Sequence, residues 1–239
     1  QEYLFYVGCV GSYDEVGQKM AKSVGKLLAQ SGLSVGILGN KETCDGNEVR
    51  AMGEMGLFAQ LAQANIEKFK VKGVKKIITL DPHALHVFKK DYPARGGKFK
   101  VLHYTEVLAE LIKKKKIKLK PHPVKITYHD PCYLGRHNGI FEEPRGILNK
   151  VPGLELKELP ESKIDSLCCG GGGGRVWMET QKGERFSDLR MEQALGVGAE
   201  VLVTSCPYCI TMFEDSRLTL NVTEKIEVKD ITEIVQEVI

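Results

Sequence analysis

The sequence contains an internal repeat, in which two copies of one pattern are offset by 123 to 125 residues. The stretch TLDPHALHVF at 79–88 aligns with TSCPYCITMF at 204–213, and Cys9 aligns with Cys132. Equal elements in equal order are expected to bury equal faces, so the repeat predicts two homologous halves.

Within each copy, strand-like and helix-like segments alternate. A strand ending at a cysteine (LFYVGC; KITYHDPC) precedes an amphipathic helix, and a buried apolar strand (KKIITL; EVLVTS) precedes a D-P or C-P turn and a further helix. Such alternation predicts parallel sheets whose post-strand loops gather at one edge. We expect an α/β fold of two tandem homologous parallel-sheet units with pseudo-twofold symmetry and cysteine loops at their interface.

The boundary between the units is predicted at KLKPHPVK, residues 118–125, which is basic and contains two prolines. We expect a first unit over 1–118, a linker over 119–123 and a second unit over 124–239. The lysine run IKKKKIK at 112–118 is interpreted as a solvated helix end that leads into this linker.

Composition narrows the class of protein. With 42% hydrophobic and 27% charged residues among 239, the chain can bury a core. A net charge of +3 and a single lysine run without interleaved aromatic residues argue against nucleic-acid binding. No apolar run is long enough to span a bilayer and no signal-peptide pattern opens the chain, so we expect a cytoplasmic protein that reaches a membrane only through partners. Because the chain starts at Gln1 and enters a strand-like run at once, we expect further sequence upstream.

Cysteines give the strongest chemical signal. The chain has seven: Cys9, Cys44, Cys132, Cys168, Cys169, Cys206 and Cys209. An odd number in a chain of this length argues against a secreted disulfide framework. Five of the thiols fall at strand-to-helix turns of the second unit, which is more than tetrahedral zinc needs, and soft ligands favour an iron–sulfur cluster or zinc over hard cations. Buried structural cysteine is the alternative interpretation.

Three segments of the second unit resemble a known family: YHDPCYLGRHNGIFEEPR, SLCCGGGGGRVWMET and TSCPYCITMF. They are similar to the CCG-domain iron–sulfur proteins, which include cysteine-rich subunits of heterodisulfide reductase and related electron-transfer subunits of oxidoreductases. The resemblance implies a noncubane [4Fe-4S] cluster whose ligands match, position by position, Cys132, Cys168, Cys169, Cys206 and Cys209. It also implies redox partner subunits, of a flavoprotein or ferredoxin-like kind.

The glycine run after the vicinal cysteines has two interpretations. Gly170 to Gly174 can adopt positive φ and turn backbone N–H groups toward sulfide or a substrate anion, as a sharp bend between two adjacent ligands requires. A flexible linker is the other interpretation.

The first unit departs from the family pattern at three ligand positions, which are occupied by Asp45, Asp81 and Ala84. Two thiols cannot hold the five-ligand cluster. Cys9 and Cys44, together with His83 and the nearby His86, could form a mixed mononuclear metal site. The preferred interpretation is a degenerate, structural half-site that covers the cluster or contacts a partner.

Three polar residues lie close to Cys132 in the sequence, namely His129, Asp130 and His137. They are expected either to form hydrogen bonds across the loops or to deliver protons near the cluster, because histidine changes charge near neutral pH.

Three functions remain open at this stage. The first is an electron-transfer subunit or domain of a multisubunit oxidoreductase, relaying electrons between a flavin-type partner and another redox centre through one cluster. The second is a disulfide reductase of the heterodisulfide type, with chemistry at the cluster. The third is a zinc-bound scaffold, since thiolates also suit zinc.

Overall fold

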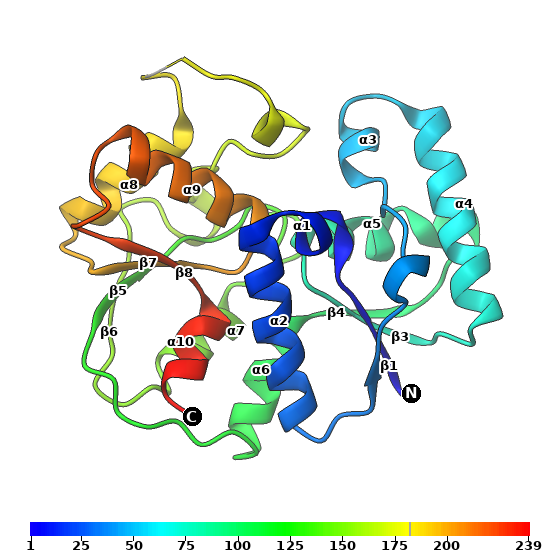
Figure 1. Ribbon diagram of the computed structural model, residues 1–239, viewed down its shortest axis with the longest axis horizontal. Helices are drawn as coiled ribbons and strands as arrows, with labels where there is room; N and C mark the ends of the chain where they lie inside the picture. Colours follow the sequence, from blue (N-terminus) through cyan, green and yellow to red (C-terminus); the bar gives the residue numbers. More distant parts are fainter. Residues whose placement is uncertain (182) are drawn as a thin grey trace.

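A computed structural model, which describes residues 1–181 and 183–239, contains two four-stranded sheets (Figure 1). In the first, the strand order is β2-β1-β3-β4, with β1 Tyr3–Tyr6, β2 Val35–Gly36, β3 Lys76–Thr79 and β4 Lys100–His103. In the second, the order is β6-β5-β7-β8, with β5 Lys125–Tyr128, β6 Glu155–Lys157, β7 Val201–Thr204 and β8 Glu227–Asp230. All the pairings between these strands are parallel, which confirms the predicted α/β class.

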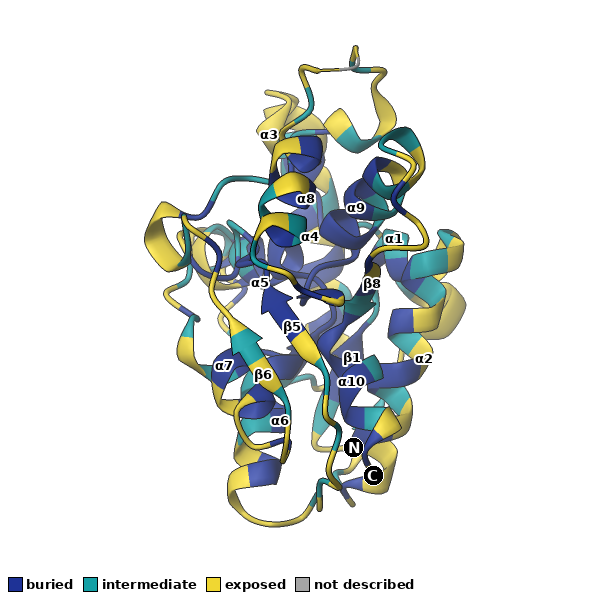
Figure 2. Cartoon of the chain, turned by 90° about the vertical axis from the view of Figure 1, so that its left-hand side faces the viewer, coloured by how far each residue is buried: buried dark blue, intermediate teal, exposed yellow. Residues whose placement is uncertain are grey.

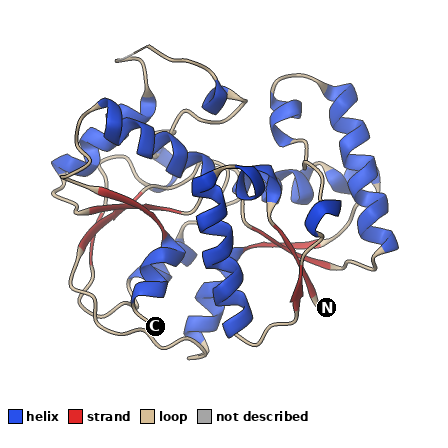
Figure 3. Cartoon of the chain, viewed as in Figure 1, coloured by secondary structure: helices blue, strands red, loops and turns tan. Residues whose placement is uncertain are grey.

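Helices flank both sheets (Figure 3). Their bounds are α1 Gly8–Tyr13, α2 Glu15–Gln30, α3 Asn47–Ala51, α4 Met55–Val71, α5 Pro82–Lys90, α6 Tyr104–Lys113, α7 Glu142–Leu148, α8 Phe186–Gly196, α9 Pro207–Thr219 and α10 Ile231–Glu237. Short 3-10 turns join some of them, among them η4 Arg175–Trp177. The central strands are rich in aromatic residues in β1 and β5 and in β-branched residues in β3 and β7. Figure 2 shows the buried residues concentrated around β1 and β5.

The two units repeat one plan down to their helix caps. Asp81 is the N-cap of α5 and Cys206 is the N-cap of α9, and each is followed by a proline at the start of the helix. Proline fits there because the first helical N–H has no intrahelical partner. The last helix of each unit, α6 and α10, begins with a capping box. The chain therefore folds as two tandem homologous units.

The units are joined through helices that lie between the sheets. Helix α2 of the first unit packs on α9 and α10 of the second, and α6 of the first unit packs on α7 of the second (Figure 1). Helices of both units therefore form the junction. One hydrophobic core runs through both units, from Phe5 and Met20 to Tyr128 and Phe213. Because the shared core is apolar and continuous, the junction fixes the loops of one unit against those of the other.

The segments that follow β1 and β5 differ in conformation. After β1 the chain enters α1, so Cys9 lies inside a short helix rather than at the end of a strand. After β5, residues 132–138 form turns. Among the residues that the structure describes, no helix combines the length and the apolar character needed to cross a membrane.

Candidate metal centre

Three loops of the second unit bring five cysteines together. Cys132 lies in the turns after β5, Cys168 and Cys169 lie in the loop after β6, and Cys206 and Cys209 lie at the start of α9 after β7. The strands are parallel, so these loops share one edge of the sheet. The sequence-based expectation that the cysteine loops gather at one edge agrees with this arrangement.

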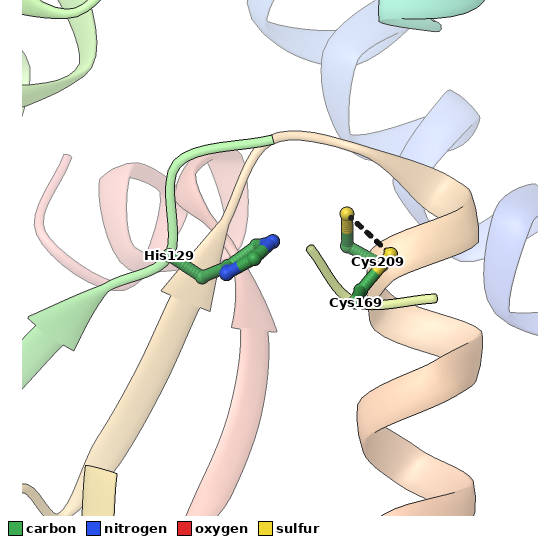
Figure 4. Close-up of side chains that lie close together, drawn as sticks. All are labelled: His129, Cys169 and Cys209. Atoms are coloured by element: carbon green, nitrogen blue, oxygen red, sulfur yellow. Dashed lines mark hydrogen bonds between the residues drawn. The ribbon is translucent and has the colours of Figure 1, made fainter. Parts of the chain in front are cut away.

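The five sulfur atoms form a continuous group. The Sγ atoms of Cys132 and Cys168 lie 4.0 Å apart, and those of Cys169 and Cys209 lie 3.3 Å apart (Figure 4). Cys168 hydrogen-bonds its neighbour Cys169, and Cys206 hydrogen-bonds Cys209 one helical turn away. Three of the five are buried, while Cys132 and Cys168 are partly accessible. Five soft donors converging in one pocket suit a metal–sulfur centre.

The glycine run is a structured turn against α9. Gly170, Gly173 and Gly174 have φ values of 84°, 66° and 78°, which L side chains rarely adopt. The N–H of Gly170 donates to Cys168 Sγ at 3.3 Å, and a Cβ on Gly171 would lie 2.9 Å from Cγ of Met212. Bare backbone is therefore required here, as predicted, and the linker interpretation is wrong.

Hydrogen bonding lowers the pKa of two of the five thiols, Cys168 and Cys206. Bonds with Cys132 and Cys169, together with the Gly170 N–H, lower the pKa of Cys168 to about 2 against the effect of burial. Burial would raise the pKa of Cys206, but bonds with Cys209 and His83 lower it to about 7. Thiolates, the form that binds metals, are thus favoured at Cys168 and Cys206.

His129 adjoins the buried end of this group. Its Nδ1 accepts a hydrogen bond from Nε of Arg190 at 3.3 Å, and one of its ring nitrogens lies within 4.8 Å of the sulfur atoms of Cys169 and Cys209 (Figure 4). Burial and the positive charge of Arg190 lower the pKa of His129 to about 3. The ring is therefore neutral at pH 7 and unsuited to releasing a proton from an imidazolium form.

The Asp130 carboxylate is held by hydrogen bonds to other parts of the second unit. Both of its carboxylate oxygens accept hydrogen bonds from Arg145, at 2.7 and 2.9 Å, and one also accepts from the backbone N–H of Lys163 at 2.7 Å. Of the two expectations for this residue, hydrogen bonding across the loops is the one that the contacts support. His137 is exposed, with its ring stacked on Tyr133 at 4.7 Å.

The first unit contributes a histidine to the cysteine group of the second. The His83 ring lies between those of Tyr133 and Tyr208, with centroid distances of 4.3 and 4.5 Å, and its Nδ1 is 2.7 Å from the carboxylate of Asp81. His83, Asp81 and Cys206 place ligand atoms within 4.8 Å of one another. A side chain of the first unit thus lies against the cysteine group of the second.

The remaining candidates in the first unit do not join His83 in a ligand group. Cys9 and Cys44 hydrogen-bond each other, which raises the pKa of Cys9 and lowers that of Cys44 to about 6. Within the described residues, no group of three ligand atoms all within 4.8 Å of one another includes either thiol. The structure therefore does not bring Cys9, Cys44 and His83 together as one ligand set. The His86 ring packs instead on Tyr133 and His137.

Some residues of the site carry no signal in the sequence. Arg190 occurs in a helix of mixed polarity and Glu48 in a short one, and both reach the site only through tertiary packing. A cavity of about 410 Å³ also opens beside the site, lined by Cys9 and Tyr13 from the first unit and by Trp177 and Tyr208 from the second. The side chain of Trp177 is 64% exposed, and its ring lies 5.9 Å from that of Tyr208 on α9.

Known proteins match nearly the whole chain. It is 45% identical over 238 residues to the probable iron-sulfur-binding oxidoreductase FadF of Bacillus subtilis, covering 99% of this chain and 34% of that protein. It is 40% identical over 241 residues to EtfAB:quinone oxidoreductase of Syntrophomonas wolfei, covering 98% and 34%. It is 35% identical over 243 residues to one of the subunits of the dihydromethanophenazine:CoB--CoM heterodisulfide reductase of Methanosarcina barkeri, covering 99% and 58%. The chain thus spans about a third of the length of the first two relatives.

A solved structure of a hypothetical protein from Helicobacter pylori superposes with a TM-score of 0.61 at 13% identity, covering 98% of this chain and 48% of that one. At this identity the likeness concerns the fold alone. Two segments of the chain, residues 3–89 and 126–214, match the CCG cysteine-rich domain. Together with the five-cysteine group, these matches establish that the chain belongs to the family of CCG cysteine-rich domain proteins and carries two copies of that domain.

Proposed function

We propose that this chain is the iron–sulfur electron-transfer part of a larger oxidoreductase. The observation that carries the proposal is the continuous group of five thiols at one sheet edge, Cys132, Cys168, Cys169, Cys206 and Cys209. These residues would hold one [4Fe-4S] cluster of the noncubane type. Such a cluster supplies one-electron chemistry at a potential that its surroundings set.

The protein around the thiols suits a relay. The cluster position is largely enclosed by α9, the glycine turn and the His83 side chain, while Cys132 and Cys168 stay partly accessible. Burial keeps water from the cluster, and an accessible ligand edge allows a partner to approach. The exposed Trp177 and the adjoining cavity offer an apolar contact surface beside Tyr208 at the start of α9.

Relatives support the oxidoreductase class. Their names include a probable iron-sulfur-binding oxidoreductase, a quinone oxidoreductase and a heterodisulfide reductase. Since these proteins extend well beyond the matched region, electron donors and acceptors are expected in other domains or subunits, of a flavin or ferredoxin-like type.

Disulfide reduction at the cluster is the alternative. Gripping a heterodisulfide between two clusters would need ligands in the first unit, where Asp81 and Ala84 replace cysteines and are buried. Asp81 is already bonded to the backbone and the ring of His83. An electron relay needs only the one cluster site of the second unit, whereas disulfide reduction between two clusters would need cysteine ligands that the first unit lacks.

The proposal is tested by anaerobic purification, with quantification of iron, sulfide and zinc, followed by EPR of the reduced and oxidised protein. We expect about four iron and about four sulfide atoms per chain, with visible absorbance. Stoichiometric zinc in a colourless protein would establish the scaffold function instead. About eight iron atoms per chain would show a second cluster and would favour the alternative function, disulfide reduction.

A further inference from the structure

The Nε2 atom of the buried His129 ring lacks a hydrogen-bond partner among the described residues. The residue itself is fully buried. Leaving a buried ring nitrogen without a hydrogen-bond partner is energetically costly, so a native protein rarely leaves one unused. The atom that would satisfy it must lie on the side where Nε2 points.

Arg190 fixes which nitrogen carries the proton. A guanidinium group has donors and no acceptor, so the Nε–H of Arg190 can bond only to an unprotonated Nδ1 of His129. In a neutral imidazole the proton then resides on Nε2. His129 is consequently a donor at Nε2, with no lone pair there to bind iron.

Arg190 is itself held rigidly. It is fully buried, and its two terminal nitrogens donate to Ser166 Oγ at 3.0 Å and to Oε1 of Gln193 at 2.7 Å. Ser166 lies two residues before Cys168, so one side chain braces both the vicinal-cysteine loop and the His129 ring. The tautomer is therefore tied to the geometry of the loop that carries the candidate ligands.

The ring plane is fixed from other directions as well. Phe213 meets the ring edge to face, with centroids 4.7 Å apart and planes at 81°. The backbone of His129 is anchored by bonds to Val203 O at 2.8 Å and from Thr204 Oγ1 at 3.3 Å. In Figure 4 the imidazole extends from the end of β5 toward the sulfur atoms of Cys169 and Cys209.

We propose that His129 donates its Nε2–H to a sulfur atom at the Cys169 and Cys209 side of the cluster, and that Arg190 is the positioning residue that fixes this tautomer. The inference rests on the proposed cluster. Hydrogen bonds to cluster sulfur stabilise the extra negative charge of the reduced state, so this donor makes the reduction potential less negative.

The test compares cluster-loaded variants by EPR-monitored redox titration at one fixed pH. His129→Leu removes the donor, and we expect a more negative midpoint potential at unchanged iron content per chain. His129→Gln keeps an amide donor and should shift the potential less. Arg190→Met leaves the ring but frees its tautomer, and should shift the potential in the same direction as His129→Leu. His137→Leu, which alters an exposed histidine of the neighbouring loop, should shift nothing.

Electron–nuclear double resonance of the wild-type cluster in H₂O and D₂O gives a second readout that needs no variant to load. In the loaded wild type we expect an exchangeable proton coupling and, with ¹⁵N-labelled histidine, only a weak nitrogen coupling. A loaded His129→Leu variant, used as a further check, should lack that proton coupling. A large nitrogen coupling would make His129 an iron ligand and overturn the inference. So would an unchanged potential in loaded His129→Leu, or no histidine-dependent proton in a loaded wild type. A wild-type protein without iron would instead refute the proposed function itself.

Discussion

The carboxylate of Glu48, on α3 of the first unit, accepts a hydrogen bond from the backbone N–H of Gly174 in the second unit at 2.7 Å. The other carboxylate oxygen accepts from the Asn47 side chain at 2.8 Å, which holds Glu48 in place. A Cβ on Gly174 would lie 2.9 Å from Sδ of Met52, so the two units are in close contact here. The degenerate unit thus anchors the far end of the glycine turn that begins at Cys168 and Cys169.

Removing this anchor should loosen the glycine turn. For Glu48→Ala we expect a loss of about 1.5–3 kcal/mol in the free energy of unfolding, because a buried N–H loses a charged acceptor. Amide hydrogen exchange across residues 170–174 should accelerate more than exchange in β7. Glu48→Gln retains an acceptor oxygen and should lose less. Glu67→Ala, on α4 away from the turn, is the control; equal exchange rates in Glu48→Ala and this control would contradict the anchoring role.

A second prediction concerns the buried ion pair beneath the Cys132 turn. Asp130→Ala leaves Arg145 buried with the more exposed Glu158 as its ion-pair partner, and should lower the free energy of unfolding by about 3–5 kcal/mol. Glu142→Ala, which breaks the surface pair with Lys163, should cost within about 1 kcal/mol. Urea denaturation of both variants measures the difference. Similar costs would mean that the Asp130 pair is not structural.

Stability should also depend on pH through Asp230, whose carboxylate accepts from the Tyr104 hydroxyl of the other unit. Burial, only partly opposed by hydrogen bonds from Thr232 and Tyr104, raises the pKa of Asp230 from 3.8 to about 7. Between these values the unfolded chain has released a proton that the folded chain retains. This group's contribution to stability therefore falls as pH rises from about 4 to about 7, by on the order of 1.4 kcal/mol per pH unit, and is constant above that range.

The measurement is the urea midpoint of wild type and Asp230→Asn across that pH range. Asparagine serves as an N-cap for α10 and does not titrate, so the variant should gain stability relative to wild type as pH rises. Asp165→Asn, at an exposed position, should track the wild type. A constant difference between wild type and Asp230→Asn at every pH would refute the raised pKa.

The repeat and the cysteine spacing were enough to predict the architecture and the gathering of five thiols, because both follow from sequence order in parallel α/β units. What could not be predicted arises from contacts across the junction. The sequence suggests His83 as a metal-binding partner of Cys9 and Cys44, yet its Nδ1 hydrogen-bonds Asp81 and its ring lies near Cys206. Glu48 of the first unit likewise meets the Gly174 N–H of the second unit only through tertiary packing. No spacing rule indicates which side chains of one unit meet those of the other.

The last prediction concerns the five-ligand assignment itself. Cys169 is buried and hydrogen-bonded to Cys168 on one side and to Cys209 on the other, so it occupies the middle of the thiol group. Serine at this position replaces a soft thiolate by a hard, weakly acidic hydroxyl, and should abolish the cluster EPR signal or alter its form. Cys44 lies in the corresponding turn of the first unit and hydrogen-bonds Cys9 instead, so Cys44→Ser should keep the cluster EPR signal and the iron content. Anaerobic iron analysis and EPR of the two variants provide a matched comparison. If Cys169→Ser retained about four iron atoms, an unaltered spectrum and normal electron transfer, a four-cysteine cluster would replace the five-ligand one.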